Sequence, residues 1–406
     1  MKAGAATRTL IFPRVFFPTE GFAELIHELH ARVLVLEGDI RCAVLALEMT
    51  SLPPEEIDAL NAILKEETGA EHCFSLAVHT FSAPHFMPDH ALKTDAEKNK
   101  KLLLRQIVYT AVREAAREAA ERLRPVTLSV GTAQCPVNSA RDVETPNGWW
   151  IANNGSGPVD HTLTAVRLTD AEGRIAAVLT HYAVQSSVLD GSQLRAGGKA
   201  VSGDLAGLMA ETLERDLGCP VLFLIGAAGD QAPREKAVGF KVGEDGMLQP
   251  TDMQDDAIAV CEKLAAEMAD AARTALMAAQ PADSETLAWR QVTVTLSAKK
   301  IERDLHKLHP TRVPPYEADG ESGQTVDLLQ VGALKLIGVK PELNCVSARQ
   351  ICGDDPMVKV VTLWNGGAKY MADAASCERI TYESQNSPFM PGAAEKLVDA
   401  AKTLLG

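Results

Sequence analysis

Apolar and polar positions alternate along this chain in a way that predicts strands and helices mixed over its whole length. Short apolar runs rich in β-branched residues are typical of strands, and several of them are separated by turn residues. They lie at 32–39, 42–49, 74–84, 127–135, 163–184, 220–230, 289–298, 328–339 and 358–365. Longer stretches with apolar residues at helical spacing predict helices at 51–67, 94–124, 204–217, 252–280 and 392–405.

This unsegregated order predicts an α/β fold in which layered mixed β-sheets are covered by helices. We expect one large domain over residues 1–406, with no sequence repeat and no low-complexity linker. Ser51 is the expected cap of its helix, and the helix at 94–124 is expected to begin at Thr94 or Asp95. Residues 302–325 are polar and rich in Pro and Gly, which predicts a long exposed loop, either a lid or a plain surface insertion.

Composition narrows the classes of partner. The chain has 406 residues, of which 46% are hydrophobic, and its net charge is −14. Such an acidic chain argues against a nucleic-acid partner and against docking on a membrane through basic residues. The first apolar run is broken by Pro13 and Arg14, so it does not resemble a signal peptide. Eight scattered cysteines without a CxxC pair are then expected to be reduced thiols, and the expected compartment is the cytoplasm.

Polar residues that could carry chemistry gather where predicted strands end, which is where functional side chains tend to lie in such folds. A small-molecule substrate is therefore the expected partner, while the oligomeric state stays open. The four places are Ala77–His85, Thr180–Ser187 followed by Ser202-Gly203-Asp204, Gly226–Pro233, and Gly338–Asn344 followed by Asn365–Tyr370.

Taken together, the order and spacing of these motifs resemble the N-terminal catalytic domain of the neutral ceramidase family. Val78-His79-Thr80-Phe81-Ser82-Ala83-Pro84 is similar to the family's Thr-His-Thr-His-Ser-Gly-Pro motif. Ser202-Gly203-Asp204, the loop Gly229-Asp230, and the tail Tyr382–Phe389 also match in order. The resemblance extends over nearly the whole chain.

The resemblance implies a zinc ion held by two His, one Glu and one Tyr, with water in the open position. Residue by residue, His79 matches the first His, Glu342 the Glu and Tyr370 the Tyr. The second His position falls on Gln185 in the best register, whereas His181 takes this place only if the register shifts. Zinc in such an open site lowers the pKa of bound water and polarises an amide carbonyl.

Two further positions depart from the family pattern. The family's Gly-Asp-x-Ser-Pro loop reads Gly229-Asp230-Gln231-Ala232-Pro233 here, so the serine hydroxyl is replaced by a methyl group. The second His of the first motif is Phe81. Asp204 and Asp230 are retained, either as acid–base helpers or as structural carboxylates that accept backbone amides at a helix start or turn.

From these residues we expect a metal-dependent hydrolase, with zinc as the expected ion, that cleaves an amide or related bond in a small soluble substrate. The alternative is a non-catalytic small-molecule-binding pseudoenzyme with the same fold, which the loss of the Ser and one His favours. Retention of His79, Glu342 and Tyr370 favours the enzyme.

Overall fold

The computed structural model describes residues 1–242, 248–302 and 304–406, and it contains one arrangement three times. Each repeat has a sheet built on four shared strands, to which the first two repeats add a fifth at the edge, and the first three shared strands are antiparallel neighbours. A short helix then leads to a fourth strand, which lies parallel to the third. A longer helix follows and packs on the first two strands of the sheet. The chain is thus a mixed α/β protein with helix-covered sheets, as its pattern predicts.

The first repeat runs from the N-terminus to Pro125. Its sheet has the order β5-β4-β3-β1-β6, and α2 covers β1 and β3. Its elements are β1 (Lys2–Thr9), β3 (His30–Glu37), β4 (Arg41–Leu47), α1 (Pro54–Thr68), β5 (His72–Ala77), α2 (Asp95–Glu121) and β6 (Arg124–Pro125). Thr94 caps α2 and forms a capping box with Glu97. Ser51 does not cap α1, because the helix begins at Pro54 and its N-cap is Pro53.

The second repeat has the sheet order β13-β11-β10-β7-β17, and α4 covers β7 and β10. Its elements are β7 (Thr127–Gln134), β10 (Thr162–Thr169), β11 (Ile175–Tyr182), α3 (Asp204–Leu217), β13 (Val221–Ile225), α4 (Asp256–Ala278) and β17 (Gln280–Ala282). Two hairpin strands, β8 (Asn138–Thr145) and β9 (Gly148–Asn154), are inserted between β7 and β10, and β8 also pairs with β14 (Gln231–Pro233). This insertion carries part of the site described below.

The third repeat has the sheet order β18-β19-β20-β22, and α8 covers β18 and β19. Its elements are β18 (Leu287–Lys299), β19 (Ala318–Val331), β20 (Leu334–Val339), α5 (Cys345–Cys352), β22 (Val358–Val361), β21 (Glu342–Leu343), β23 (Tyr370–Met371), α6 (Ala374–Arg379), α7 (Tyr382–Gln385) and α8 (Ala393–Leu405). The predicted loop 302–325 is shorter than expected, because 318–325 form the first half of β19.

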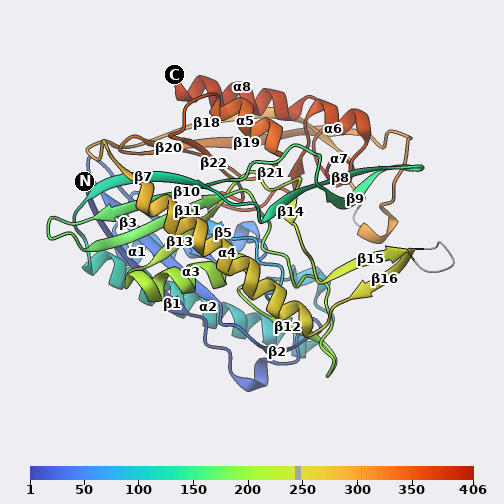
Figure 1. Ribbon diagram of the computed structural model, residues 1–406, viewed down its shortest axis with the longest axis horizontal. Coiled ribbons are helices and arrows are strands. Elements are labelled where there is room, and N and C mark those ends of the chain that lie inside the picture. The colour runs from blue at the N-terminus through green and yellow to red at the C-terminus, as the bar shows by residue number, and fades with distance from the viewer. Residues whose placement is uncertain (243–247, 303) are drawn as a thin grey trace.

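Long helices lie on the outside of the molecule and the sheets lie between them. Figure 1 shows α4 crossing the front of the molecule and α8 running along its top, above β18 and β19. The first two sheets share one apolar core, and the third sheet adds a second cluster with α8. Smaller pairs lie at the periphery, namely β2 (Phe22–Leu25) with β12 (Lys199–Val201) and β15 (Val238–Val242) with β16 (Leu248–Asp252). All eight cysteines are free thiols, as expected for a reduced chain.

Candidate functional site

The ends of equivalent strands in the three repeats meet at one place. The third strand of each sheet ends at Leu47, Tyr182 or Val339, and the residue three positions later is Thr50, Gln185 or Glu342. Chain segments beyond the fourth strands bring His79, Asp230 and Tyr370. Pairing of β21 with β23 sets Glu342 beside Tyr370. The carboxyl ends of strands in sheets of this kind are the usual place for a ligand.

His79 is held in a strained but well-anchored position. Its φ is 62°, a left-handed conformation that is uncommon for a residue with a side chain. Its ring Nδ1–H donates to the carbonyl of Thr50 over 2.6 Å, which leaves the Nε2 lone pair free. Nε2 lies 3.0 Å from Glu342 Oε2, but the direction is wrong for a hydrogen bond. Burial opposes protonation of the ring, yet the Glu342 carboxylate outweighs it and raises the pKa of His79.

Gln185 connects this pair to a buried cation. Its Nε2 donates to Glu342 Oε2 over 2.9 Å, and its Oε1 accepts from Arg141 over 2.8 Å. Both ends of the amide are therefore engaged, and a flipped amide would place its NH₂ against the guanidinium. Burial would raise the pKa of Glu342, but the charges of His79 and Arg141 hold this pKa below its usual value.

Arg141 lies at the centre of the cluster, at a bulge of β8 between Ala140 and Asp142. Its Nε donates to Glu383 over 2.7 Å, and its guanidinium lies 5.3 Å from the centre of the Tyr370 ring. The same guanidinium lies 5.9 Å from the ring of Tyr382. Because Arg141 is buried, its charge needs these partners, and Glu342 and Glu383 supply it with two carboxylates.

Three of the residues suggested by sequence fit a metal ion, and the fourth does not. His79 Nε2 is a buried imidazole nitrogen without a hydrogen bond, and it converges with Glu342 on a point beside Tyr370. Imidazole, carboxylate and phenol oxygen are donors that suit zinc. Gln185 is different, because its amide oxygen faces Arg141. Within the described residues no three His, Cys, Asp or Glu side chains form a metal-binding group, so a metal here requires Tyr370.

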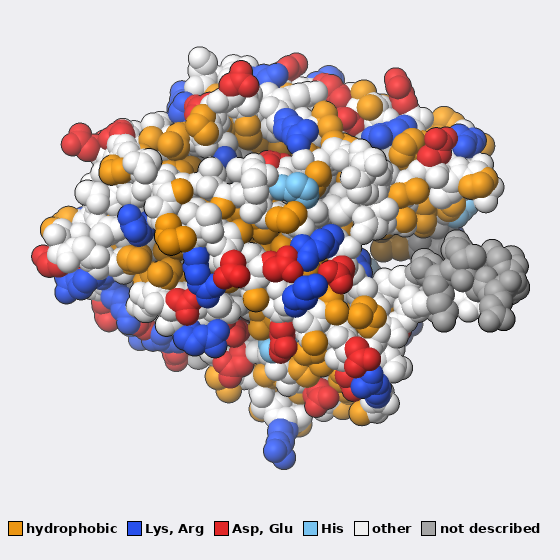
Figure 2. All heavy atoms as spheres, viewed as in Figure 1, with side chains coloured by type: hydrophobic (Ala, Val, Ile, Leu, Met, Phe, Trp, Pro, Cys, Tyr) orange, Lys and Arg blue, Asp and Glu red, His pale blue; other side chains and the backbone are white. Residues whose placement is uncertain are grey.

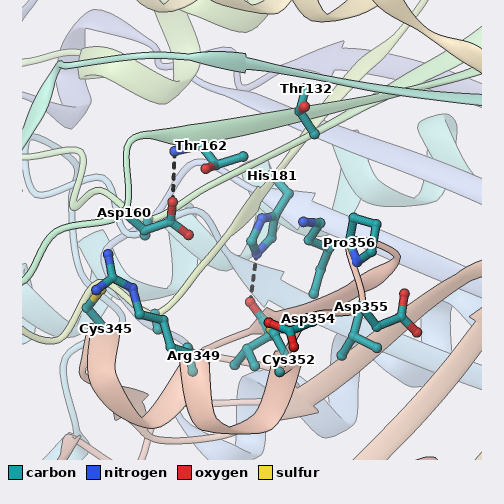
Figure 3. Close-up of a pocket in the computed structure, with 17 residues that line it drawn as sticks. Thr132, Asp160, Thr162, His181, Cys345, Arg349, Cys352, Asp354, Asp355 and Pro356 are labelled. Atoms are coloured by element: carbon teal, nitrogen blue, oxygen red, sulfur yellow. Dashed lines mark hydrogen bonds between the residues drawn. The ribbon is translucent and has the colours of Figure 1, made fainter.

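His181 does not belong to this cluster. It lies inside β11 rather than beyond the end of this strand, and its Nε2 donates to the carbonyl of Val360 over 2.7 Å. Figure 3 shows its ring in a separate cavity of about 310 Å³, beside Asp160 and the helix that carries Cys352. Burial, with some help from Lys359, lowers the pKa of His181 to about 4, so this ring is neutral. The register that assigns Gln185 to the cluster is the one the structure adopts.

Of the two aspartates, only Asp230 lies near the cluster. Asp204 is fully buried at the start of α3 and accepts the backbone N–H groups of Val188, Leu189 and Leu205, which makes it a structural carboxylate. Asp230 accepts from the N–H of Cys345 over 2.9 Å, and its carbonyl accepts from the N–H of Arg141. Burial raises the pKa of Asp230 to about 6.

A second buried acid, Asp142, lies near Asp230 and Arg141, and no sequence motif marked it. Burial, followed by the nearby Glu383 carboxylate, raises the pKa of Asp142 to about 9, so this carboxyl holds a proton at neutral pH. Arg141 and Asp142 are adjacent charged residues in a short strand, a pattern typical of a solvent-exposed edge. The sequence signal for this region was Tyr382-Glu383 in the tail that resembles the family, because Glu383 accepts from Arg141.

The positions that depart from the family pattern lie close by. Phe81 packs its edge on the His79 ring at a centroid distance of 4.7 Å. Ala232 is buried in β14, opposite Ser139 of β8. Its methyl group offers no hydroxyl to the cluster. Among the described residues no helix is both long and apolar enough to cross a membrane.

Comparison with known proteins finds the same architecture in solved structures. No family model matches the sequence, and no curated protein matches it. Neutral ceramidase from Pseudomonas aeruginosa superposes with a TM-score of 0.74 at 16% identity, over 99% of this chain and 74% of the ceramidase chain. A ceramidase solved in complex with C2 gives 0.72 at 15% identity, over 100% and 75%. The chain therefore has the neutral ceramidase fold over nearly its whole length, as its succession of motifs predicted.

Proposed function

We propose that this protein is a hydrolase that cleaves an amide or related bond in a small soluble substrate. The observation that carries the proposal is the convergence of His79 and Glu342 beside Tyr370, with a buried imidazole nitrogen left without a hydrogen bond. A strained backbone and a buried nitrogen outside hydrogen-bond geometry cost stability, and both are found where function requires them.

His79, Glu342 and Tyr370 would hold a zinc ion, which would supply an activated water and polarise the substrate carbonyl. The residues of the chain have roles that do not depend on this ion. Thr50 fixes the tautomer of His79, so that the Nε2 lone pair is free and lies near Glu342. Gln185 and Glu383 hold Arg141 in place, and Arg141 keeps Glu342 ionised. Cytoplasmic location is part of the same proposal.

A specific observation favours a second candidate, a non-catalytic binder of small molecules. Gln185 uses both ends of its amide within the cluster, and the guanidinium of Arg141 already neutralises part of the negative charge of Glu342. Such a closed network can stabilise a binding site without performing chemistry. Ala232 supports this alternative as well, since it lacks the hydroxyl that the family places in this loop.

Hydrolysis of a panel of short N-acyl compounds separates the two candidates. Release of free amine is measured for the purified protein with and without added zinc, together with its metal content. We expect turnover in the wild type and a loss of about 100-fold or more in His79→Ala, because a residue that would hold the ion is removed. His306→Ala, an exposed histidine far along the chain, is the control. Binding of panel members without turnover would establish the binder instead.

A further inference from the structure

A small hollow next to the cluster is lined by charged side chains of both signs. Its volume is about 220 Å³, and Asp142, Asp230, Trp149 and Arg379 line it together with the turn 154–158. Asp142 follows Arg141 in the chain, and the Asp230 carbonyl accepts the Arg141 N–H, so the hollow adjoins the centre already described. Its size is below the roughly 300–1,000 Å³ of sites for drug-sized ligands, so it suits a small group.

No acid among the described residues forms an ion pair with the guanidinium of Arg379, which lines this hollow. Arg379 stacks on Trp149 with its central carbon 4.8 Å from the ring, and its Nη2 donates to Ser376 over 3.2 Å. Its Nε is buried without a hydrogen bond, and none of the described acids lies within ion-pair distance. A guanidinium that is fixed by stacking and keeps free N–H groups is well suited to a carboxylate.

Two acids also line the hollow. Asp142 and Asp230 are both nearly buried, and Asp142 Oδ1 has no hydrogen-bond partner. An acid that faces a small cavity with a free oxygen is suited to a ligand nitrogen. The hollow thus offers a cation for a negative group and carboxyl oxygens for an amide or amine nitrogen.

We infer that the hollow receives the amine half of the substrate and that this half bears a carboxylate, which pairs with Arg379, so that the substrate is an N-acyl amino acid. This inference rests on the proposed function and names its substrate class. An N-acyl amino acid carries its nitrogen and its carboxylate on neighbouring atoms, so the nitrogen can face the acids while the carboxylate faces Arg379. A plain alkylamine would leave Arg379 without a partner. A phosphate is less suited, because its two negative charges would face Asp230.

The reaction balances without any further reagent. Water adds to the carbonyl carbon, the C–N bond breaks, and the leaving nitrogen takes the proton from the Asp142 carboxyl. The proton that water releases returns to Asp142. The products are the free carboxylic acid and the free amino acid. Asp142 is then a catalytic residue, while Glu383 next to it is a positioning residue.

Binding measurements test the inference independently of turnover. N-acetyl-L-alanine and N-acetyl-L-alaninamide differ only in the carboxylate, and their dissociation constants are measured by calorimetry on the full chain. We expect the acid to bind at least about tenfold more tightly, as charge-assisted hydrogen bonds typically provide. Arg379→Gln should remove this difference. Arg349→Gln, in the wall of the separate cavity that holds His181, should leave it unchanged.

A second variant, Arg379→Lys, covers the case in which the glutamine variant unfolds, and thermal unfolding monitors both. Lysine keeps the charge but loses the planar fork, so an intermediate preference is expected. Equal binding of acid and amide by the wild type, no binding of either, or an unchanged preference in a folded Arg379 variant would overturn the inference. Preference for the acid without hydrolysis would leave the binding site standing and would refute the proposed function alone.

Discussion

One side chain, Gln185, determines how tightly the cluster can bind a metal ion. Its amide oxygen accepts from Arg141 and its NH₂ donates to Glu342, so it stabilises the arrangement of the neighbouring charges. Imidazole is a better ligand for zinc than an amide. A histidine in this place would give up both hydrogen bonds and offer a nitrogen to the point on which His79 and Glu342 converge.

We therefore expect Gln185→His to raise the zinc content of the purified protein towards one ion per chain. Elemental analysis after dialysis against a defined zinc concentration gives the answer. His181→Ala is the matched histidine control, because this ring hydrogen-bonds to Val360 in a separate cavity, and it should leave the metal content unchanged. The opposite result, with metal lost in His181→Ala and no gain in Gln185→His, would mean that the ion is held elsewhere.

Asp142 gives a prediction about stability and pH. Its pKa is about 9 in the folded protein, whereas an unfolded aspartate has a pKa near the ordinary value of 3.8. Between these values the folded chain holds a proton that the unfolded chain has released, so stability falls as the pH rises. Asp142→Asn removes this loss and keeps an N–H donor for Glu383. The variant should gain about 1 kcal/mol or more over the wild type at neutral to alkaline pH.

Melting temperatures between about pH 5 and about pH 9 measure this effect. The gap between Asp142→Asn and the wild type should widen steadily across this range. Asp319→Asn, an exposed position in β19, should follow the wild type at every pH. A constant gap would indicate that Asp142 is ionised in the folded protein.

Sequence could place single residues only where a motif or a strand end marked them. His79, Gln185, Glu342 and Tyr370 were predicted in this way, and the structure brings them together. Arg141, Asp142 and Arg379 were not, because their importance comes from burial and from partners far away in the chain, such as Glu383. Alternation along β8 gives no hint that a charged pair points inwards, since the local bulge that turns it arises from pairing with β9.

Strands and long helices approach one another closely at two equivalent glycines. Gly4 of β1 lies under α2, where an added Cβ would be 2.2 Å from the carbonyl of Ala119. Gly131 of β7 lies under α4, where an added Cβ would be 2.0 Å from the carbonyl of Ala275. The atoms that an added Cβ would meet belong to the backbone and cannot rotate away. These glycines therefore set the distance between each long helix and its sheet.

Gly131→Ala should accordingly destabilise the protein by at least about 2 kcal/mol, the cost typical of overpacked cores. Urea unfolding followed by circular dichroism measures the change. Gly155→Ala, at a position where an added Cβ would meet no atom within 4 Å, should stay within about 0.5 kcal/mol of the wild type. Equal midpoints for the two variants would show that α4 can move away from β7 at little cost.

At the level of elements the sequence pattern was informative. The β3–β4 and β10–β11 hairpins and the long helices α2 and α4 follow from local periodicity and turns. The predicted cap of α1 was wrong, because the N-cap is Pro53, two residues after Ser51, and the helix begins at Pro54. The predicted loop at 302–325 was too long, because its polar, Gly-containing last third, from Ala318 onwards, pairs with β18. Strand pairing of this kind cannot be read from one segment alone.

For the whole molecule, charge and the size of the hollow bear on the choice of substrate. The net charge is −14, and Figure 2 shows basic and acidic side chains interspersed on the visible face rather than gathered into one basic area. An acidic protein is repelled by anionic lipid headgroups. The hollow beside the cluster, at about 220 Å³, is small for the long-chain amine half of a lipid amide.

We therefore expect no turnover of ceramide by the zinc-supplemented protein. Fluorescent ceramide in detergent micelles is incubated beside N-acetyl-L-alanine, and both products are quantified. His79→Ala serves as the blank for each reaction. Clear release of fatty acid by the wild type, lost in the blank, would contradict this expectation and would also show that Ala232 does not prevent such chemistry.

The threefold pattern of the fold was invisible in the sequence, which contains no recognisable repeat. It emerges only from the sheet orders β5-β4-β3-β1, β13-β11-β10-β7 and β22-β20-β19-β18, each followed by a covering helix. Side chains within the repeats have diverged, so that Thr50, Gln185 and Glu342 occupy equivalent places with different chemistry. Hydrophobic patterning specifies the layers, but equivalence between distant segments requires their positions in space.

Because the centre draws on all three repeats, it is assembled late during synthesis. A growing chain that has completed the first two repeats already carries His79, Arg141, Gln185 and Asp230, yet it has none of the carboxylates that balance the arginine. Glu342 and Glu383 leave the ribosome only near the end of translation, and domains generally fold from the N-terminal side as they emerge. In a nascent chain or a prematurely terminated product, Arg141 therefore lacks both Glu342 and Glu383 as well as the rings of Tyr370 and Tyr382 beside it, so the centre cannot form before the third repeat is made.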